Sequence, residues 1–422
     1  MASLESPSRG IVQLGVRLSL VAACAALASV VISAQNHWIG PLDSHPSIAY
    51  ASTQPTDRAA TLNEALASGA KTLQRDAQTG YLKSVLDAFD ISIDSQLLVF
   101  SKTGVQATFT SPKSPRALYY DQSVVVGYIP TAPVIEIASD DAQQGVNFYV
   151  IDQRAEKPML QRRTSCLSCH VSHSTLEVPG LIVRSHTVAD DGTVMTGATD
   201  VTHATPHPDR WGGWYVTVDT LSQAYQQRAH AGNITTEGQG YTSNQIFTDW
   251  INSDPMSHGY LSALSDSVSL LAFDHQAHAV NLFTRLNWEA RVDPASADVH
   301  RLVNELADYL LFVDEAAMSI PLTPRPGFAA HLAATTPKDR RGRSLAELNA
   351  ETRLLKYPCS YMIYSPAFDG LPAPVKQAVY ARMIDILAGH DPQKKYARLS
   401  GSDRQAILDI LADTKPDFHL TS

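Results

Sequence analysis

The chain has 422 residues, 44% of them hydrophobic, which is enough apolar material for a packed globular protein with one large domain or two smaller ones. Its formal net charge of −9 is mild, and no block of Lys and Arg stands out. This balance argues against a nucleic-acid-binding protein and against attachment to an anionic membrane surface by charge alone.

The N-terminal segment has the pattern of an export signal. Arg9 and Arg17 supply positive charge, residues 18–32 form an apolar run, and Ala34 offers a small residue for cleavage. The run is shorter than the roughly 20 residues that a bilayer-spanning helix needs. We therefore expect residues 1–34 to be a signal peptide and the mature protein to be periplasmic or otherwise exported by a bacterium. An uncleaved membrane anchor is the alternative.

Residues 35–230 are expected to form a β-rich region. Apolar residues at helical spacing predict two helices at its start, over 61–76 and 81–89. Short β-rich runs separated by Pro, Gly, Asp and Asn then predict an antiparallel meander, with strands at 97–100, 117–120, 123–128, 134–137 and 147–151. Residues 171–219 are expected to be mostly irregular, with a turn at 190–192 and a strand at 214–218.

Residues 240–422 are expected to form a mostly α-helical region, after a candidate linker at 231–239. The apolar spacing predicts helices at 244–252, 260–289, 297–317, 344–355, 374–388 and 402–414. The predicted fold class is therefore α+β, with a β-rich N-terminal half followed by a mostly α-helical C-terminal half.

Within the β-rich region 35–230, residues 166–170 read Cys-Leu-Ser-Cys-His. The C-x-x-C-H pattern is the attachment signature of c-type haem. Thiols at Cys166 and Cys169 can form thioethers with the two vinyl groups of one porphyrin, and His170 can then supply a nitrogen to the iron. The motif predicts one covalent haem c, bound by Cys166, Cys169 and His170.

Two other interpretations of the motif remain open: a redox-active dithiol and half of a zinc site. A dithiol of the thioredoxin type should follow a strand and open a long helix, with no need for the histidine. Zinc needs two further ligands, and the sequence has no second Cys pair. The export signal favours haem, because covalent haem attachment takes place outside the bacterial cytoplasmic membrane. Cleavage after residue 34 would remove Cys24, and haem would use Cys166 and Cys169. Only Cys359 would then remain, so no disulfide is expected.

Several further stretches, together with the haem motif, support a resemblance. They are residues 115–120, 126–128, 210–216, 274–276, 357–361 and 371–376. With them the chain resembles a family of exported bacterial proteins described as cytochrome c domain-containing. The resemblance covers most of the mature chain. It implies haem binding and electron transfer but no particular substrate.

The sixth iron ligand has three main candidates, which we predict as Met195, His203 or His275. Met195 lies in a Gly-containing segment that could fold over the haem, and His203 lies on a proline-flanked loop. His275 lies on a long predicted helix next to an apolar stretch. Each also has an ordinary interpretation, as a core methionine or as a hydrogen-bonded histidine. His186 is a weaker candidate, and an open sixth position is the remaining possibility.

Arg210 and Trp211 are predicted to contact the haem. The forked donors of an arginine suit a propionate, and a tryptophan packs well against a porphyrin edge. The alternative is a turn into a strand with ordinary core aromatics. Arg162 and Arg163, just before the motif, are further candidates for the propionates.

These features predict an exported mono-haem cytochrome that transfers electrons to or from a partner protein or membrane complex. Two alternatives stay open. One is a haem enzyme of the peroxidase or oxidase type with an open distal site, and the other is a haem-based sensor or binding module. Association with a membrane is expected only if the N-terminal segment is uncleaved.

Overall fold

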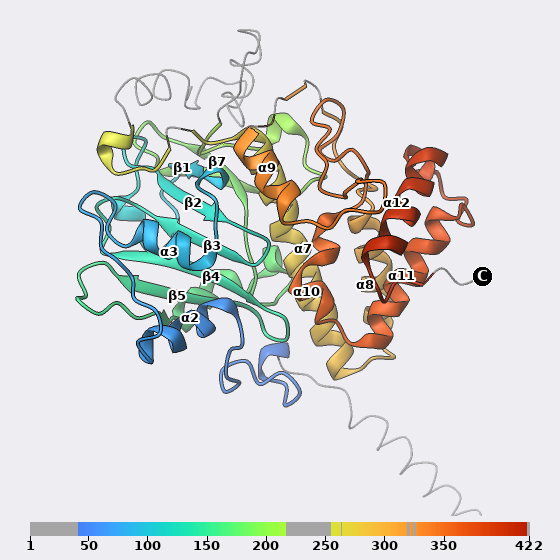
Figure 1. Cartoon of the computed structure of the whole chain (residues 1–422), viewed down its shortest axis with the longest axis horizontal. Coiled ribbons are helices and arrows are strands. Elements are labelled where there is room, and N and C mark those ends of the chain that lie inside the picture. The colour runs from blue at the N-terminus through green and yellow to red at the C-terminus, as the bar shows by residue number, and fades with distance from the viewer. Residues whose placement is uncertain are drawn as a thin grey trace, which may run out of the picture.

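The computed structural model describes residues 41–216 and 255–419, except 263, 319, 320, 323 and 325. The expected signal peptide, the candidate linker and the helix predicted at 244–252 lie outside the described residues. In the described part, a large sheet and a group of helices stand side by side (Figure 1). The predicted α+β class is confirmed, with the sheet in the N-terminal half and most helices in the C-terminal half.

The sheet has seven strands in the order β6-β5-β4-β3-β2-β1-β9, all antiparallel. Its strands are β1 (Leu97–Val99), β2 (Arg116–Tyr120), β3 (Val124–Tyr128), β4 (Val134–Asp141), β5 (Gly145–Asp152), β6 (Gln161–Arg162) and β9 (Trp214–Tyr215). Strands β1 to β6 follow one another in space as they do in sequence, which confirms the predicted meander. Strand β9 returns from beyond the haem motif and closes the far edge beside β1.

The two faces of the sheet pack against different elements. Because side chains alternate along a strand, Tyr119 and Ile137 point to one face, where α2 (Arg58–Ala67) and α3 (Leu82–Phe89) cover them (Figure 1). Leu118, Tyr120, Val146 and Phe148 point to the other face and share a hydrophobic cluster with the C-terminal helices. The sheet and the helical half therefore have one continuous core between them.

Helix α7 (Ser267–Val292) connects the two halves. It starts at Asp266, whose carboxylate accepts from Ser269 N–H, and it is buried along nearly its whole length. It packs on β5, α8 and α10. The remaining helices of this half are α8 (Ala297–Leu310), α9 (Pro326–Ala334), α10 (Pro366–Asp369), α11 (Ala373–Leu387) and α12 (Gly401–Thr414). No helix among the described residues has the length and apolar character needed to cross a bilayer.

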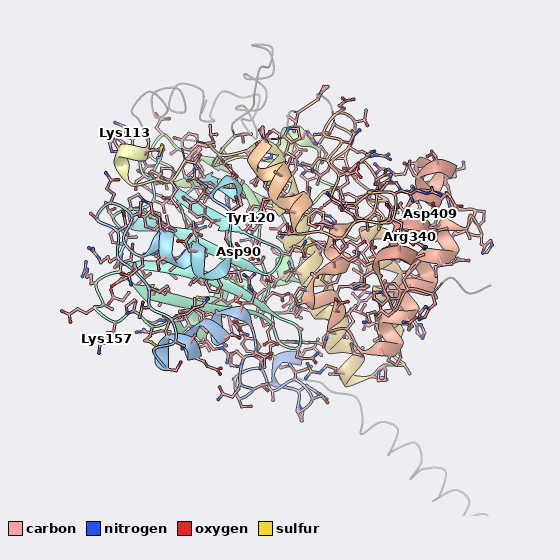
Figure 2. All side chains as sticks on the ribbon, in the orientation of Figure 1. Asp90, Lys113, Tyr120, Lys157, Arg340 and Asp409 are labelled. Atoms are coloured by element: carbon pink, nitrogen blue, oxygen red, sulfur yellow. The ribbon has the colours of Figure 1, made fainter. Side chains whose placement is uncertain are left out.

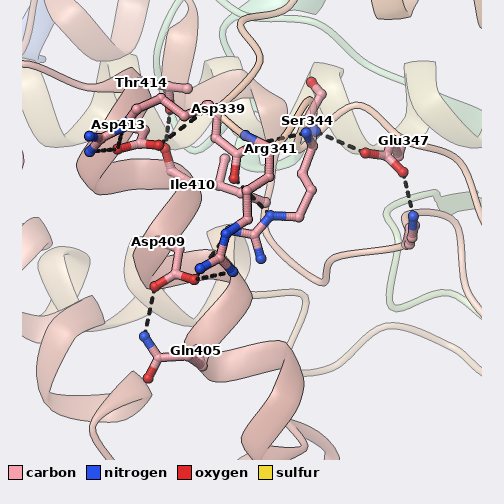
Figure 3. A network of polar contacts seen from close by, with 12 residues as sticks. Asp339, Arg341, Ser344, Glu347, Gln405, Asp409, Ile410, Asp413 and Thr414 are labelled. Carbon is pink, nitrogen blue, oxygen red and sulfur yellow. Dashed lines mark hydrogen bonds and ion pairs between the residues drawn. The ribbon is translucent and has the colours of Figure 1, made fainter.

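The helix predicted over 344–355 is wrong, because side chains take the backbone N–H groups that a helix would use. Ser344 and Glu347 begin as a helix cap would, with Ser344 N–H donating to Glu347 Oε1. Asn349 Oδ1 then accepts from the N–H groups of residues 351, 352 and 353, which forms a turn. Ion pairs of Arg340 and Arg343 with Asp413 and Asp409 hold the preceding loop on α12 (Figure 3).

Other boundaries also differ from the predictions. Helix α7 begins at Ser267 rather than at residue 260, and α8 ends at Leu310 rather than at residue 317. Helix α2 ends at Ala67 rather than at residue 76, because Gly69 follows with a φ of +74°. The segment 171–219 is less irregular than expected, since β7 (Arg184–Val188) and β8 (Val194–Asp200) form a two-stranded hairpin. Gly192, with a φ of +87°, lies in its connection, where a turn was predicted.

Candidate haem attachment site

The C-x-x-C-H motif lies directly after the edge strand β6. It occupies a 3-10 turn, η4 (Thr164–Cys166), and one turn of α-helix, α4 (Leu167–His170), which Val171 N–H closes by donating to Leu167 O. Cys166 is half-buried against the main hydrophobic cluster, whereas Cys169 is exposed, and both thiols are free. The segment therefore presents two unpaired thiols three residues apart at the surface.

His170 has a fixed orientation. Its Nδ1 lies 2.8 Å from Gly180 O, and its ring packs against Phe148 with centroids 4.5 Å apart. Because a carbonyl oxygen only accepts, Nδ1 carries the proton and Nε2 keeps its lone pair. Burial lowers the pKa of the imidazole, which favours this neutral form. A histidine that ligates a metal through one nitrogen commonly donates from the other to a carbonyl group in this way.

The helical half holds the residue that follows this carbonyl, since Gly180 C=O shares a peptide unit with Leu181 N–H. Asn281 on α7 accepts from Leu181 N–H and donates to Leu181 O, at 2.9 and 2.8 Å. A Cβ at Gly180 would lie 2.2 Å from Asn281 Oδ1, so only glycine fits this close approach. Sequence analysis missed Gly180 and Asn281. The Pro179-Gly180 pair marks a turn, but no local signal indicates which helix would contact it.

Charged side chains from two sheets surround the motif. On the inner face of the large sheet, Arg116 Nη1 lies 3.3 Å from Glu136 Oε2. After burial, which is the largest cause, Arg116 and Arg184 lower the pKa of His170 while Glu136 raises it. Glu136 also raises the pKa of Cys166, again after burial. Sequence analysis singled out neither Arg116 nor Arg184 as a neighbour of the motif.

Near the motif, Arg184 is partly exposed to solvent, and Glu136 has a carboxylate oxygen without a hydrogen-bond partner among the described residues. Arg184, on β7, pairs with Asp200 at 2.8 Å and donates to Ser174 Oγ at 2.6 Å, and its side chain is 37% exposed. Glu136 Oε1 is buried and has no hydrogen-bond partner among the described residues. The surroundings of His170 therefore combine one incompletely paired carboxylate with two arginines.

His203 and His275 lie together in a different, fully buried cluster. Their Nδ1 atoms are 2.9 Å apart, and His275 Nε2 lies 2.6 Å from Ser360 Oγ. The two rings stack with Tyr309 and Phe312. Burial lowers the pKa of both histidines, that of His275 to about 3. Both nitrogens of His275 are thus engaged inside the protein.

Arg210 belongs to this second cluster. Its Nη1 lies 3.2 Å from Asp274 Oδ2, with side-chain exposures of only 2% and 0%. Its remaining nitrogens donate to His203 O and Thr205 O at 2.8 and 2.7 Å. The guanidinium expected to hold a propionate is therefore occupied by a buried carboxylate and two carbonyls.

The other predicted residues are distributed around the structure. Trp211 is buried against His207, with a φ of +69° and no partner for its indole N–H among the described residues. Met195 lies on β8 with half of its surface exposed. His186 Nδ1 is 3.4 Å from Gly197 O. Arg162 contacts the ring of Tyr50. Among the described residues, no hydrogen bond or ring contact joins residues 166–170 to Met195, His203, His275 or Arg210.

The motif follows strand β6, as expected of a thioredoxin-type dithiol, but it does not open a long helix. The helix at the motif has four residues, whereas a thioredoxin-type dithiol opens a long one. Within residues 41–216 and the described part of 255–419, no three or more His, Cys, Asp or Glu side chains gather as a metal site would require.

Comparison of the chain with protein-family models, with curated proteins and with solved structures finds no match.

Proposed function

We propose that this protein is a mono-haem c-type cytochrome, with haem attached through Cys166 and Cys169 and with His170 as the proximal iron ligand. The observation that carries the proposal is the donation from His170 Nδ1 to Gly180 O, which leaves Nε2 with a free lone pair. This imidazole stands beside two free thiols in the one sequence pattern that c-type haem attachment requires.

The residues around the motif fit a porphyrin. Phe148 supplies an apolar ring against His170, and Leu118 and Val150 point to the same face of the sheet. Arg116 and Arg184 supply the forked cations that suit propionates. When bound, haem would supply a one-electron redox centre. The protein's own residues would tether it, orient its ligand and balance its charge.

Electron transfer follows from this assignment as the proposed activity. The partner would be a redox protein or a membrane electron-transfer complex on the outer side of the cytoplasmic membrane. The export pattern of residues 1–34 supports that location, because c-type haem is attached there. The same pattern supports a soluble exported protein if the segment is cleaved, and an anchored one if it is retained.

A haem enzyme or binding module with an open distal site is the second candidate function. The placement of the proposed sixth ligands favours it. His275 has both nitrogens engaged, His203 is bonded to His275 at Nδ1, and Met195 points its side chain into solvent on a separate hairpin. With none of them at hand, a small molecule could bind the sixth position.

The test is an optical spectrum of the protein co-expressed with a c-type haem maturation system, reduced, before and after addition of carbon monoxide. Haem that survives denaturing electrophoresis is the expected result, and its absence would contradict the proposal. A spectrum unchanged by carbon monoxide indicates a firm sixth protein ligand and an electron carrier. A prompt shift indicates an open or labile site and favours the enzyme or binding module.

A further inference from the structure

A second polar site lies in the interior at the end of β4. Asp140 is 7% exposed, and both of its carboxylate oxygens lack hydrogen-bond partners among the described residues. Gln122, in the connection between β2 and β3, has a buried Nε2 that also lacks a partner there. An unsatisfied acceptor pair and an unsatisfied donor thus face one small region of the core.

A small, partly open cavity joins these two side chains. It has a volume of about 10 Å³, and its wall includes Asp140, Gln122, Ser123, Leu181 and Gln276. A cavity needs roughly 10–15 Å³ of this kind to hold one water molecule, and the water needs two to four polar partners. The cavity has the size of a single water and at least the required polar partners.

We propose that this cavity is a buried hydration site, in which a water accepts from Gln122 Nε2 and donates to the Asp140 carboxylate. The requirement is physical, because burying a carboxylate without a hydrogen-bond partner is strongly unfavourable. Water alone matches both neighbours, since it accepts from the amide and donates to the carboxylate. A cation would satisfy Asp140 but would face the amide donor.

The hydration site has a path to solvent. A second, more open cavity of about 350 Å³ shares four wall residues with the small cavity, namely Asp121, Gln122, Ser123 and Gln276. Its remaining wall includes Tyr120, Asp90 and the side chains of α9, where the sheet meets the helical half (Figure 2). The site thereby lets Asp140 exchange its proton with solvent while it stays buried.

Burial and neighbouring charges raise the pKa of Asp140 toward neutral pH. Burial, and then the neighbouring carboxylates Asp141 and Asp57, raise the pKa of Asp140 from 3.8 to about 7. The open cavity adds Asp121 with its ion-pair partner Arg58, and also Asp90 and His331. The α7 residues of the small cavity carry no titratable group. Between pH 4 and 7, the folded protein therefore still binds a proton at Asp140, whereas the unfolded chain has already lost it. Stability from this group is present below pH 4 and is lost as pH rises to 7.

The test compares thermal unfolding of the mature protein and of Asp140→Asn between pH 4 and 8. We expect the difference in Tm to change steadily over pH 4–7, with the wild type losing stability relative to the variant as pH rises. The exposed Asp190→Asn is the matched control and should run parallel to the wild type. Parallel curves for Asp140→Asn would overturn the proposal.

Two further measurements keep the proposal testable if Asp140→Asn folds poorly. Gln122→Met removes the donor at nearly constant volume, and we expect it to move the midpoint of the pH dependence upward, because hydration of the ionised carboxylate is weakened. A crystal structure of the wild type should show one water between Asp140 and Gln122. Stabilisation that is specific to Na⁺, K⁺ or NH₄⁺ at constant ionic strength would instead identify a cation site and overturn the assignment of water.

Discussion

The structure contains two histidine environments that differ in what they leave available. His170 is half-buried at the edge of the sheet, bonded at one nitrogen and free at the other, beside exposed Cys169. His203 and His275 are fully buried, bonded to each other and stacked with Tyr309 and Phe312. The first environment retains a lone pair at Nε2. In the second, both nitrogens of His275 and Nδ1 of His203 are engaged in internal contacts.

This difference shows that burial and histidine content alone do not identify a metal ligand. The buried pair has the more strongly perturbed protonation, since burial lowers the pKa of His275 to about 3. Perturbed pKa values occur both at functional sites and in structural networks. What distinguishes His170 is the carbonyl partner that fixes its tautomer, together with the neighbouring thiols. The predictions below use this contrast.

The largest effect is expected at the thiols. Replacing both Cys166 and Cys169 by alanine should abolish covalent haem entirely, because no thioether can then form. Haem staining after denaturing electrophoresis measures this directly. Cys359→Ala is the control, since Cys359 is fully buried away from the surface, and it should retain the stain. Equal staining of the double variant and the control would remove the proposed function.

In the buried cluster, Arg210→Leu should destabilise the protein by about 3–5 kcal/mol without loss of attached haem. The reason is that Asp274 would be left as an uncompensated buried carboxylate. Urea unfolding measures the change, and haem staining of the soluble fraction checks the attachment. Adding Asp274→Leu should recover most of the lost stability, because the charge is then gone. Failure of the double variant to recover would show that the hydrogen bonds of Arg210 to His203 and Thr205 dominate.

The two buried histidines should make stability fall at acidic pH. The unfolded chain binds protons on histidine below about pH 6.5, whereas His275 stays neutral in the folded state down to about pH 3. For each pH unit that the solution becomes more acidic within this range, this group therefore lowers the free energy of unfolding by up to about 1.4 kcal/mol. His275→Phe, which keeps an aromatic ring in the stack, should flatten the profile between pH 4 and 6.5. A variant with an unchanged slope would show that the folded state protonates His275 as readily as the unfolded chain does.

The smallest effect is expected at Met195. Since half of its surface is exposed, Met195→Leu should change stability by less than about 0.5 kcal/mol. It should also leave the spectrum of the reduced haem protein unaltered if the sulfur does not ligate iron. A changed spectrum would instead identify Met195 as the sixth ligand and would require the β7–β8 hairpin to close over the haem.

The sequence by itself determined the features that depend on local pattern. Alternation of apolar residues determined the strands of the meander. Helical spacing with end signals determined α3, α11, α12 and the first residue of α8. The five residues from Cys166 to His170 determined the candidate chemistry. These features need no knowledge of distant parts of the chain, because the residues that specify them are neighbours in sequence.

Only the tertiary structure decided which residues surround each histidine. His203 and His275 are 72 residues apart, and Asn281 reaches Leu181 across 100. Arg116 on β2 and Glu136 on β4 come together because both strands pair with β3, which lies between them. Residues 344–355 likewise form a loop and not a helix, because the side chain of Asn349 accepts from the backbone and ion pairs hold the segment before it on α12. Such contacts depend on packing between elements, and no periodicity within one segment encodes them.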